Sequence, residues 1–334
     1  MDKFNAEWLA QYQEDILEPE LKICDAHHHL WDYPSYQYRA EELLEDISCG
    51  HRVVSTVYME CMWAYDRDAA EHLRSVGETC FVKGVQERYQ DTATEIAKCM
   101  VGSVYLDKPG VVEALDAHME ANSRFRGIRH ASGWHPSSDV PPTHMGAGEG
   151  LLADKQFRLG FAELGKRNLS YDAWLYHNNI LELDELAKAF PDSHIILDHT
   201  GGPLGIGPYA GKRNEVFDEW KKAIDVLSTN ENVFVKIGGL NMQLNGFAWE
   251  KKTMPPTSGE LAEATKPFYL HCIERFGVER CMWQSNFPVD KVSCSYDVLW
   301  NSFKRITQRF SDAEKNWLYH DTAAKVYRFS DIQS

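Results

Sequence analysis

Hydrophobic and polar positions follow two alternating patterns along the chain. Short runs rich in β-branched or aromatic residues recur, and longer segments with apolar residues at three- and four-residue spacings lie between them. The short runs predict eight strands, at Lys22–His29, Val54–Glu60, Phe81–Gln86, Phe125–His130, Leu169–Leu175, His194–His199, Val233–Gly238 and Arg280–Ser285. The longer segments predict helices at Asp66–Val76, Val111–Ala121, Lys155–Arg167, Ile180–Phe190, Asn214–Ser228, Glu260–Phe276 and Tyr296–Phe310, with a helical tail at Asp312–Tyr327.

Eight strand–helix units in sequence predict an α/β protein of one fold, the (β/α)8 TIM barrel. A doubly wound sheet usually stops at about five or six strands. A dinucleotide-binding fold would also need a glycine fingerprint after its opening strand, where this chain has HHHLWDYPSY. No low-complexity linker divides the chain, so residues 1–334 are expected to form a single domain with a core over residues 22–327.

The composition of the chain limits which kinds of molecule it is expected to bind. The chain has 50 acidic and 35 basic side chains and a net charge of −15, so its average field repels nucleic acids and anionic membrane surfaces. No apolar run approaches the roughly 18 residues of a membrane helix, and the N-terminal segment lacks the pattern of a signal peptide. Its eight cysteines form no CxxC pair. We therefore expect a cytoplasmic protein with reduced thiols and a small-molecule substrate.

Titratable side chains gather at the predicted strand ends, where a barrel enzyme carries its active site. His27 and His29 lie two residues apart and so face the same side of the first strand. The later strands contribute polar residues at or near their ends: Arg129, His130, Tyr176, His177, Asp198, His199 and Lys236. Neutral imidazoles in such an arrangement suit a divalent ion such as zinc. Without a metal, they could donate hydrogen bonds to a developing oxyanion.

Several of these residues have more than one interpretation. Arg129 and Lys236 could bind a substrate carboxylate, or form buried ion pairs with Asp198 or Glu60. Glu60 is either a site carboxylate or a residue that caps its strand. Asp25 could orient an imidazole or accept a hydrogen bond from a strand-end amide.

Three segments are expected to be loops over the site. Ala131–Ala153 is long and rich in Gly, Pro and Ser, which favours a lid. The glycines of Gly201–Gly211 permit close approach of the backbone to a ligand, and Gly239–Gly259 should close over the seventh strand. Trp31 follows the first strand and could stack on a planar or sugar-like substrate, although core packing is the commoner use of tryptophan.

Four motifs together resemble the amidohydrolase superfamily: DAHHHLWD, GIRH, FPDSHIILDHTGGP and MWQSNFPVDK. More narrowly, the chain is similar to the amidohydrolase 2 group of barrel hydrolases, which includes lactonases, from Ile23 to Tyr327. The resemblance implies that the HxH pair is His27 and His29 and that the strand-six histidine is His199. It also implies that Arg129 holds polar groups of the substrate. Members of the group use one divalent ion or none, and both alternatives stay open for this chain.

The chain departs from the family pattern at the eighth strand. The resemblance implies an aspartate there as the base toward water, but Asn286 occupies the position, and an amide cannot take a proton. Asp290, His177 or His199 could replace it. A different reaction, such as decarboxylation, would also remove the need for that aspartate.

These inferences favour a hydrolase that opens a lactone or similar cyclic ester of a small, anionic or polyhydroxylated substrate. His27, His29 and His199 would polarise the carbonyl, directly or through one divalent ion, zinc being favoured, and Asp290 or His177 would activate water. Further expected substrate-binding residues are Arg129, His130, Lys236, Tyr176, Asn286, Trp31 and Glu60. The alternatives are a metal-dependent decarboxylase of a ring carboxylate and a non-catalytic barrel that binds a small ligand. The helical tail favours self-association.

Overall fold

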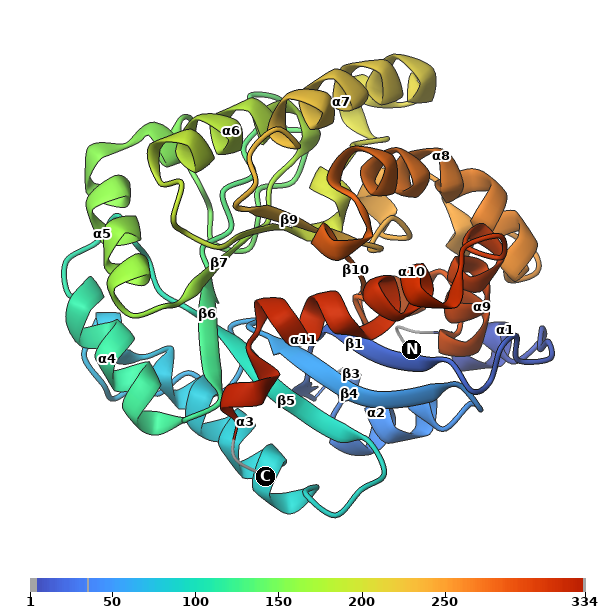
Figure 1. Cartoon of the computed structure of the whole chain (residues 1–334), viewed down its shortest axis with the longest axis horizontal. Coiled ribbons are helices and arrows are strands. Elements are labelled where there is room, and N and C mark those ends of the chain that lie inside the picture. Colours follow the sequence, from blue (N-terminus) through green and yellow to red (C-terminus); the bar gives the residue numbers. More distant parts are fainter. Residues whose placement is uncertain (1–4, 35, 333–334) are drawn as a thin grey trace.

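The chain folds into a ring of eight parallel strands inside a layer of helices (Figure 1). The computed structural model describes residues 5–34 and 36–332. In sheet order the barrel strands are β1 (Lys22–His28), β4 (Arg52–Met59), β5 (Glu95–Ser103), β6 (Phe125–Arg129), β7 (Ser170–Ala173), β8 (Ile195–Leu197), β9 (Val233–Ile237) and β10 (Cys281–Trp283). A separate hairpin, β2 (Trp31–Tyr33) and β3 (Tyr36–Tyr38), follows the first barrel strand. The expected (β/α)8 barrel is therefore confirmed.

Helices connect the strands and cover the outside of the ring (Figure 1). They are α1 (Ala6–Leu9), α2 (Ala40–Ile47), α3 (Val76–Arg88), α4 (Val111–Ala121), α5 (Lys155–Lys166), α6 (Ile180–Ala189), α7 (Arg213–Leu227), α8 (Ser258–Phe276), α9 (Tyr296–Ile306), α10 (Asp312–Asn316) and α11 (Thr322–Val326). A π-helical turn, Trp317–Asp321, joins the last two. Within residues 5–34 and 36–332, no helix is both long enough and apolar enough to cross a bilayer.

One predicted strand and one predicted helix are wrong. Phe81–Gln86 lies inside α3, and the third barrel strand is β5, which the hydrophobic pattern did not reveal. Val82 and Val85 are buried three residues apart, which is a helical spacing, although valine and phenylalanine are residues typical of strands. The segment Asp66–Val76 is mostly irregular and contains only a 3-10 turn at Glu71–Leu73.

The C-terminal helix closes one end of the barrel. Strand side chains in the barrel interior form an apolar cluster with Val326 and Tyr327 of the tail. They include Val57, Met59 and Phe234. In Figure 1 the red helices α10 and α11 cross in front of the strands. The tail is therefore part of the barrel interior, and its last buried residue approaches the strand carboxylates described below.

The ring closes between its first and last strands through a buried carboxylate. Asp25 of β1 accepts hydrogen bonds from the Ser285 amide (2.8 Å), the Ser285 hydroxyl (2.5 Å) and the Tyr296 hydroxyl (3.0 Å). Beyond β10, the Asn286 amide donates to the His27 carbonyl and the His29 amide donates to the Phe287 carbonyl. Burial raises the pKa of Asp25 to about 6, and these hydrogen bonds oppose the rise. Asp25 thus joins the two ends of the sheet next to His27.

Removing one donor from Asp25 should weaken the closure. Ser285→Ala is expected to cost about 1–3 kcal/mol in the free energy of unfolding, because a buried carboxylate loses a short hydrogen bond. Ser302→Ala is the matched control, since its buried hydroxyl donates only to the Leu299 carbonyl of the same helix. Urea denaturation of both variants checks this, and an equal loss in the two would contradict the special role of the Asp25 closure.

Candidate functional site

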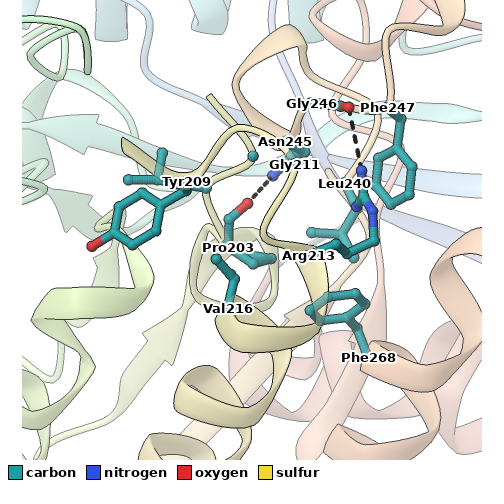
Figure 2. Close-up of a pocket in the computed structure, with 12 residues that line it drawn as sticks. Pro203, Tyr209, Gly211, Arg213, Val216, Leu240, Asn245, Gly246, Phe247 and Phe268 are labelled. Carbon is teal, nitrogen blue, oxygen red and sulfur yellow. Dashed lines mark hydrogen bonds between the residues drawn. The ribbon is translucent and has the colours of Figure 1, made fainter. Parts of the chain in front are cut away.

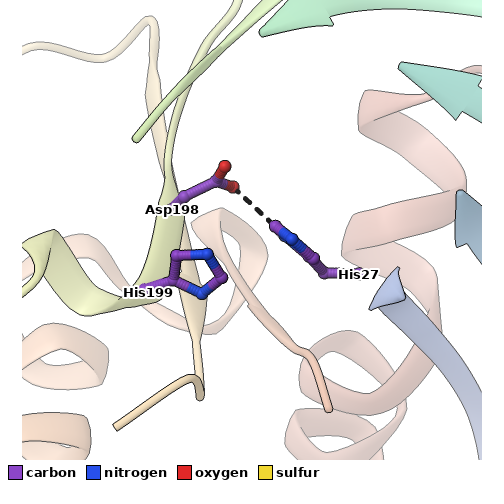
Figure 3. Close-up of side chains that lie close together, drawn as sticks. All are labelled: His27, Asp198 and His199. Carbon is purple, nitrogen blue, oxygen red and sulfur yellow. Dashed lines mark ion pairs between the residues drawn. The ribbon is translucent and has the colours of Figure 1, made fainter. Parts of the chain in front are cut away.

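Two histidines and one aspartate meet at the carboxyl ends of β1 and β8 (Figure 3). His27 Nδ1 lies 3.6 Å from Asp198 Oδ1, and the rings of His27 and His199 have centroids 4.5 Å apart. All three side chains are buried, and each offers a ligand atom within 4.8 Å of the others. The strand ends thus gather three metal-ligating side chains in a small volume.

A local backbone conformation brings two consecutive residues to this group. In a regular strand, Asp198 and His199 would point to opposite faces. Instead His199 adopts left-handed dihedral angles (φ 51°, ψ 39°), as does Thr200, so the chain turns and both side chains enter the group. Gly239 makes room for this turn, because a Cβ there would lie 2.3 Å from His199 Nδ1.

His29 lies at the edge of the group and does not belong to the three-residue cluster. Its Nε2 is 3.2 Å from His27 Nε2, and its Nδ1 donates to the Met59 carbonyl at 2.8 Å. That hydrogen bond leaves the Nε2 lone pair directed at His27. The Trp31 ring stacks on His29 with centroids 6.1 Å apart, so the imidazole is fixed from two sides.

His199 is held by two further residues. The side-chain amide of Gln284 lies 2.8 Å from His199 Nδ1, and the indole of Trp174 meets the imidazole edge-on, with centroids 4.6 Å apart. A partner on Nδ1 decides whether Nε2 carries a proton or a lone pair. Gln284 therefore controls which chemistry His199 offers to the site.

The imidazoles of the site are neutral. Burial, reinforced by the neighbouring cations Lys236 and Arg129, holds the pKa of His27 well below its ordinary value. Burial and contact with His27 do the same to the pKa of His199. Burial and Arg129 lower the pKa of His29 to about 3. Neutral rings keep a lone pair, which is the form that binds a metal ion.

Two buried cations approach the carboxylate of Asp198. Lys236 Nζ lies 3.2 Å from Oδ1, and Arg129 Nη1 lies 3.8 Å from Oδ2. Burial raises the pKa of Asp198, but Lys236, His199 and Arg129 outweigh it, so the net shift is downward. Asp198 is therefore an ionised carboxylate beside two neutral imidazoles.

Each cation is anchored by a second carboxylate. Arg129 Nε donates to Glu60 at 2.6 Å, and His144 of the β6–α5 loop contacts the same oxygen at 2.8 Å. Lys236 Nζ donates to Asp172 of β7 at 2.7 Å. The predicted cationic residues Arg129 and Lys236 are thus both present at the site, but in ion pairs rather than with free charges.

The C-terminal tail reaches this network. The Tyr327 hydroxyl donates to Asp172 Oδ1 at 2.6 Å, and Lys236 Nζ lies 5.4 Å from the centroid of the Tyr327 ring. A chain of contacts therefore runs from Tyr327 through Asp172 and Lys236 to Asp198 and His27. The end of the barrel that the tail closes is physically connected to the end that carries the site.

The donor set fits one divalent ion. Both oxygens of Asp198 are fully buried, and their close partners among the described residues are the ion-pairing cations Lys236 and Arg129 and the imidazole of His27. This carboxylate beside the neutral imidazoles of His27 and His199 matches the nitrogen and oxygen ligands that first-row divalent ions bind. His27, Asp198 and His199 are therefore the residues that would hold the ion. The expected HxH pair contributes His27 to this group, and His29 lies next to it.

Asn286 and Asp290 form a pair beside His27. Asn286 Nδ2 donates to Asp290 Oδ1 at 2.8 Å, and the Asn241 amide donates to Oδ2 at 3.1 Å. Asp290 is fully buried, and burial raises the pKa of its carboxyl to about 7. The hydrogen bonds of the Asp290 carboxylate to described residues run to Asn286 and Asn241, and none reaches His27, Asp198 or His199, so its role as the replacement base stays a prediction.

Three expected site residues have other surroundings. His130 packs against Tyr105 and Phe157 and accepts from the Leu106 amide, without a described contact to the metal-ligand group. Tyr176 donates to the Pro141 carbonyl and so secures the β6–α5 loop. His177 accepts from the Leu204 amide through Nδ1.

Sequence reasoning missed several residues that complete the site. These are Gln284, His144, Asp172, Trp174 and Tyr327, and it treated Asp198 only as an ion-pair partner. Asp198 had a visible signal, since it directly precedes His199, but strand alternation argued for the opposite face. The other contacts join residues far apart in sequence, such as Tyr327 with Asp172, and have no local signature.

The two glycine-rich loops, Gly201–Gly211 and Gly239–Gly259, contact each other (Figure 2). Asn245 Nδ2 donates to the Pro203 carbonyl at 2.9 Å, and the Gly205 amide donates to the Leu244 carbonyl at 2.8 Å. A Cβ on Gly205 would lie 2.2 Å from the Asn245 carbonyl oxygen. The glycine at this position therefore permits close loop-to-loop approach, where the sequence suggested approach to a ligand.

Loss of the Tyr327 hydroxyl should change the environment of the His27 imidazole. Tyr327→Phe removes a donor from Asp172, so Lys236 is expected to shift and the side-chain ¹⁵N resonances of His27 to move. Tyr319→Phe is the matched control, because this buried tail hydroxyl contacts only Thr307. Imidazole NMR of histidine-labelled protein checks this. Unchanged His27 resonances in Tyr327→Phe, or equal changes in both variants, would contradict the connection.

Comparison with known proteins gives the family of the chain. Residues 24–329 match the family described as Amidohydrolase. An uncharacterised protein of Sinorhizobium fredii is 33% identical over 92% of this chain and 99% of its own. An L-fucono-1,5-lactonase of Burkholderia multivorans is 22% identical over 91% and 95% of the two chains. A zinc-bound amidohydrolase structure from Burkholderia multivorans superposes with a TM-score of 0.71 at 21% identity, over 92% of this chain and 99% of that one. The chain belongs to the amidohydrolase family.

Proposed function

We propose that this protein is a hydrolase that opens a lactone or similar cyclic ester of a small molecule. The observation that carries the proposal is the buried group of His27, Asp198 and His199 at the mouth of the barrel. Its two neutral imidazoles and one carboxylate suit a divalent ion, with zinc favoured. Distant relatives named as L-fucono-1,5-lactonases support a lactone as the substrate. In the reaction, water adds to the acyl carbon, the ring C–O bond breaks, and the product is a hydroxy acid.

The chain's own residues would have separate tasks. A bound ion would polarise the carbonyl and lower the pKa of water. Arg129 and Lys236 fix the carboxylate of Asp198 and supply positive charge where negative charge develops. Gln284 and Trp174 hold the ring of His199. The low exposure of all these groups would exclude bulk water during the reaction.

Asp290 is the best candidate for the base that takes a proton from water. Its carboxyl has a pKa raised by burial to about 7, which suits proton transfer near neutral pH. Its two described hydrogen bonds leave further lone pairs on the carboxylate. His177 is less suitable, because its Nδ1 accepts a hydrogen bond and the neutral ring then carries its proton on Nε2.

A panel of lactones, assayed with and without chelator, tests the proposal. We expect ring opening by the metal-loaded protein and a loss of at least about 100-fold in kcat/KM after metal removal, restored by zinc. A pH indicator follows acid release, and His27→Gln should lose activity at every metal concentration. If no ring ester is opened at any metal loading, the proposal is wrong. Carbon dioxide release from ring carboxylates would instead identify a decarboxylase, and ligand binding without turnover a binding protein.

The role of Asp290 predicts a specific pH dependence. The ionised base accumulates above its pKa of about 7, so kcat/KM should rise as the pH increases through that value. Asp290→Asn is expected to lower kcat by about 100-fold or more and to flatten this rise. Asp184→Asn is the matched control, since this buried aspartate pairs with Lys188 and Asn230 near the ends of α6 and α7. An unaltered pH profile in Asp290→Asn would show that another group is the base.

A further inference from the structure

A cleft of about 510 Å³ opens above the barrel mouth, within the range of roughly 300–1,000 Å³ that accommodates small ligands. Its walls come from the N-terminal segment and from four loops that follow β1, β6, β9 and β10. The lining residues are Asn5, Trp31, Tyr36, Pro141, Met242, Gln243, Leu244, Glu250, Pro288, Val289 and Val292. We call it the mouth cleft.

Two walls of the mouth cleft contact residues beside the metal-ligand group. Trp31, one of its walls, stacks on His29, whose Nε2 lies 3.2 Å from His27 Nε2. Pro288, on another wall, follows Asn286 by two residues, and the Asn286 amide donates to the His27 carbonyl. Trp31 and His29 therefore connect the mouth cleft to His27 by side-chain contacts.

Most of the lining is apolar. Trp31 and Tyr36 present aromatic rings, and Met242, Leu244, Val289 and Val292 present aliphatic side chains. Such walls favour hydrocarbon over hydroxylated groups, because the lining side chains that could replace the lost water as hydrogen-bond partners are limited to a few, chiefly Asn5, Gln243 and Glu250.

Charge argues against an anionic substituent in the mouth cleft. Among the described residues that line it, Glu250 is the one ionisable carboxylate and there is no lysine or arginine. The two cations below it are already paired, Arg129 with Glu60 and Lys236 with Asp172. A carboxylate on the substrate would therefore meet a negative side chain and no free positive one.

We propose that the mouth cleft binds an uncharged, apolar arm of the substrate, so that the natural substrate is a lactone with an alkyl or aryl substituent. The inference rests on the proposed function for the lactone itself, and on the mouth cleft for the arm. It differs from the anionic or polyhydroxylated substrate that the sequence suggested, which stays the alternative.

A graded series of substituents tests the arm. We would measure kcat/KM for γ-butyrolactone and for its γ-ethyl, γ-butyl and γ-hexyl derivatives, each alkyl compound beside one of equal length that ends in a carboxylate. Each buried methylene should raise kcat/KM by roughly threefold to fourfold until the mouth cleft is filled. The carboxylate-terminated compound should be the poorer substrate of each pair of equal length.

Two variants locate the effect in the mouth cleft. Val292→Thr changes one methyl to a hydroxyl at nearly constant volume, and Leu244→Asn makes a second wall polar. Both variants should reduce the increase of kcat/KM with the length of the alkyl substituent. Leu181→Asn on α6 is the matched control, since Leu181 is an exposed leucine away from the mouth cleft, and it should leave the dependence intact.

The failure of this inference can be told apart from failure of the proposed function. Lactone opening that is independent of chain length, or fastest with the carboxylate, would overturn the apolar arm and leave the hydrolase intact. If no lactone is opened, calorimetry measures whether the mouth cleft binds the matching 5-alkyl-2-pyrrolidinones, which are not hydrolysable lactones. Binding that tightens with chain length and weakens in Val292→Thr supports the mouth cleft, and no binding at any length overturns it.

Discussion

The structure depends most on the ionised carboxylate of Asp198 inside a barrel that excludes water. A buried charge is costly unless other charges and dipoles compensate it. Lys236 and Arg129 approach it from two sides, and each is held by its own carboxylate, Asp172 or Glu60. Counting these three carboxylates as ionised against the two cations, with the imidazoles neutral, leaves one negative charge. A divalent ion at His27, Asp198 and His199 would reverse that sign.

This compensation links parts of the fold that are distant in sequence. Asp172 comes from β7, Lys236 from β9 and Tyr327 from the tail, and their contacts join the tail-closed end of the barrel to the metal-ligand group. Asp25 performs a comparable task at the seam, where it joins β1 to Ser285 directly beside His27. Fold stability and site geometry therefore share the same buried polar contacts, so a change in one is expected to disturb the other.

The sequence predicted the parts of this arrangement that local patterns specify. Strand ends carry their residues to a common edge, so His27, Arg129, His199 and Lys236 could be assigned to one site before the structure was known. The third strand could not be predicted, because Phe81, Val82 and Val85 of α3 are residue types typical of a strand and β5 lacks a strict alternation of apolar and polar residues. The left-handed turn at His199, which brings Asp198 inward, and the pairing of Lys236 with Asp172 depend on tertiary packing, and no window of sequence reveals them.

Cobalt(II) absorption spectroscopy tests most directly whether His27, Asp198 and His199 together form one site for a divalent ion. The metal-stripped protein is expected to bind one equivalent of cobalt with the intense visible bands of a low-symmetry, imidazole-containing site. Asp198→Asn and His199→Gln are each expected to weaken this binding by at least about tenfold. No stoichiometric spectrum in the wild-type protein, or the same spectrum and affinity in both variants, would contradict such a site.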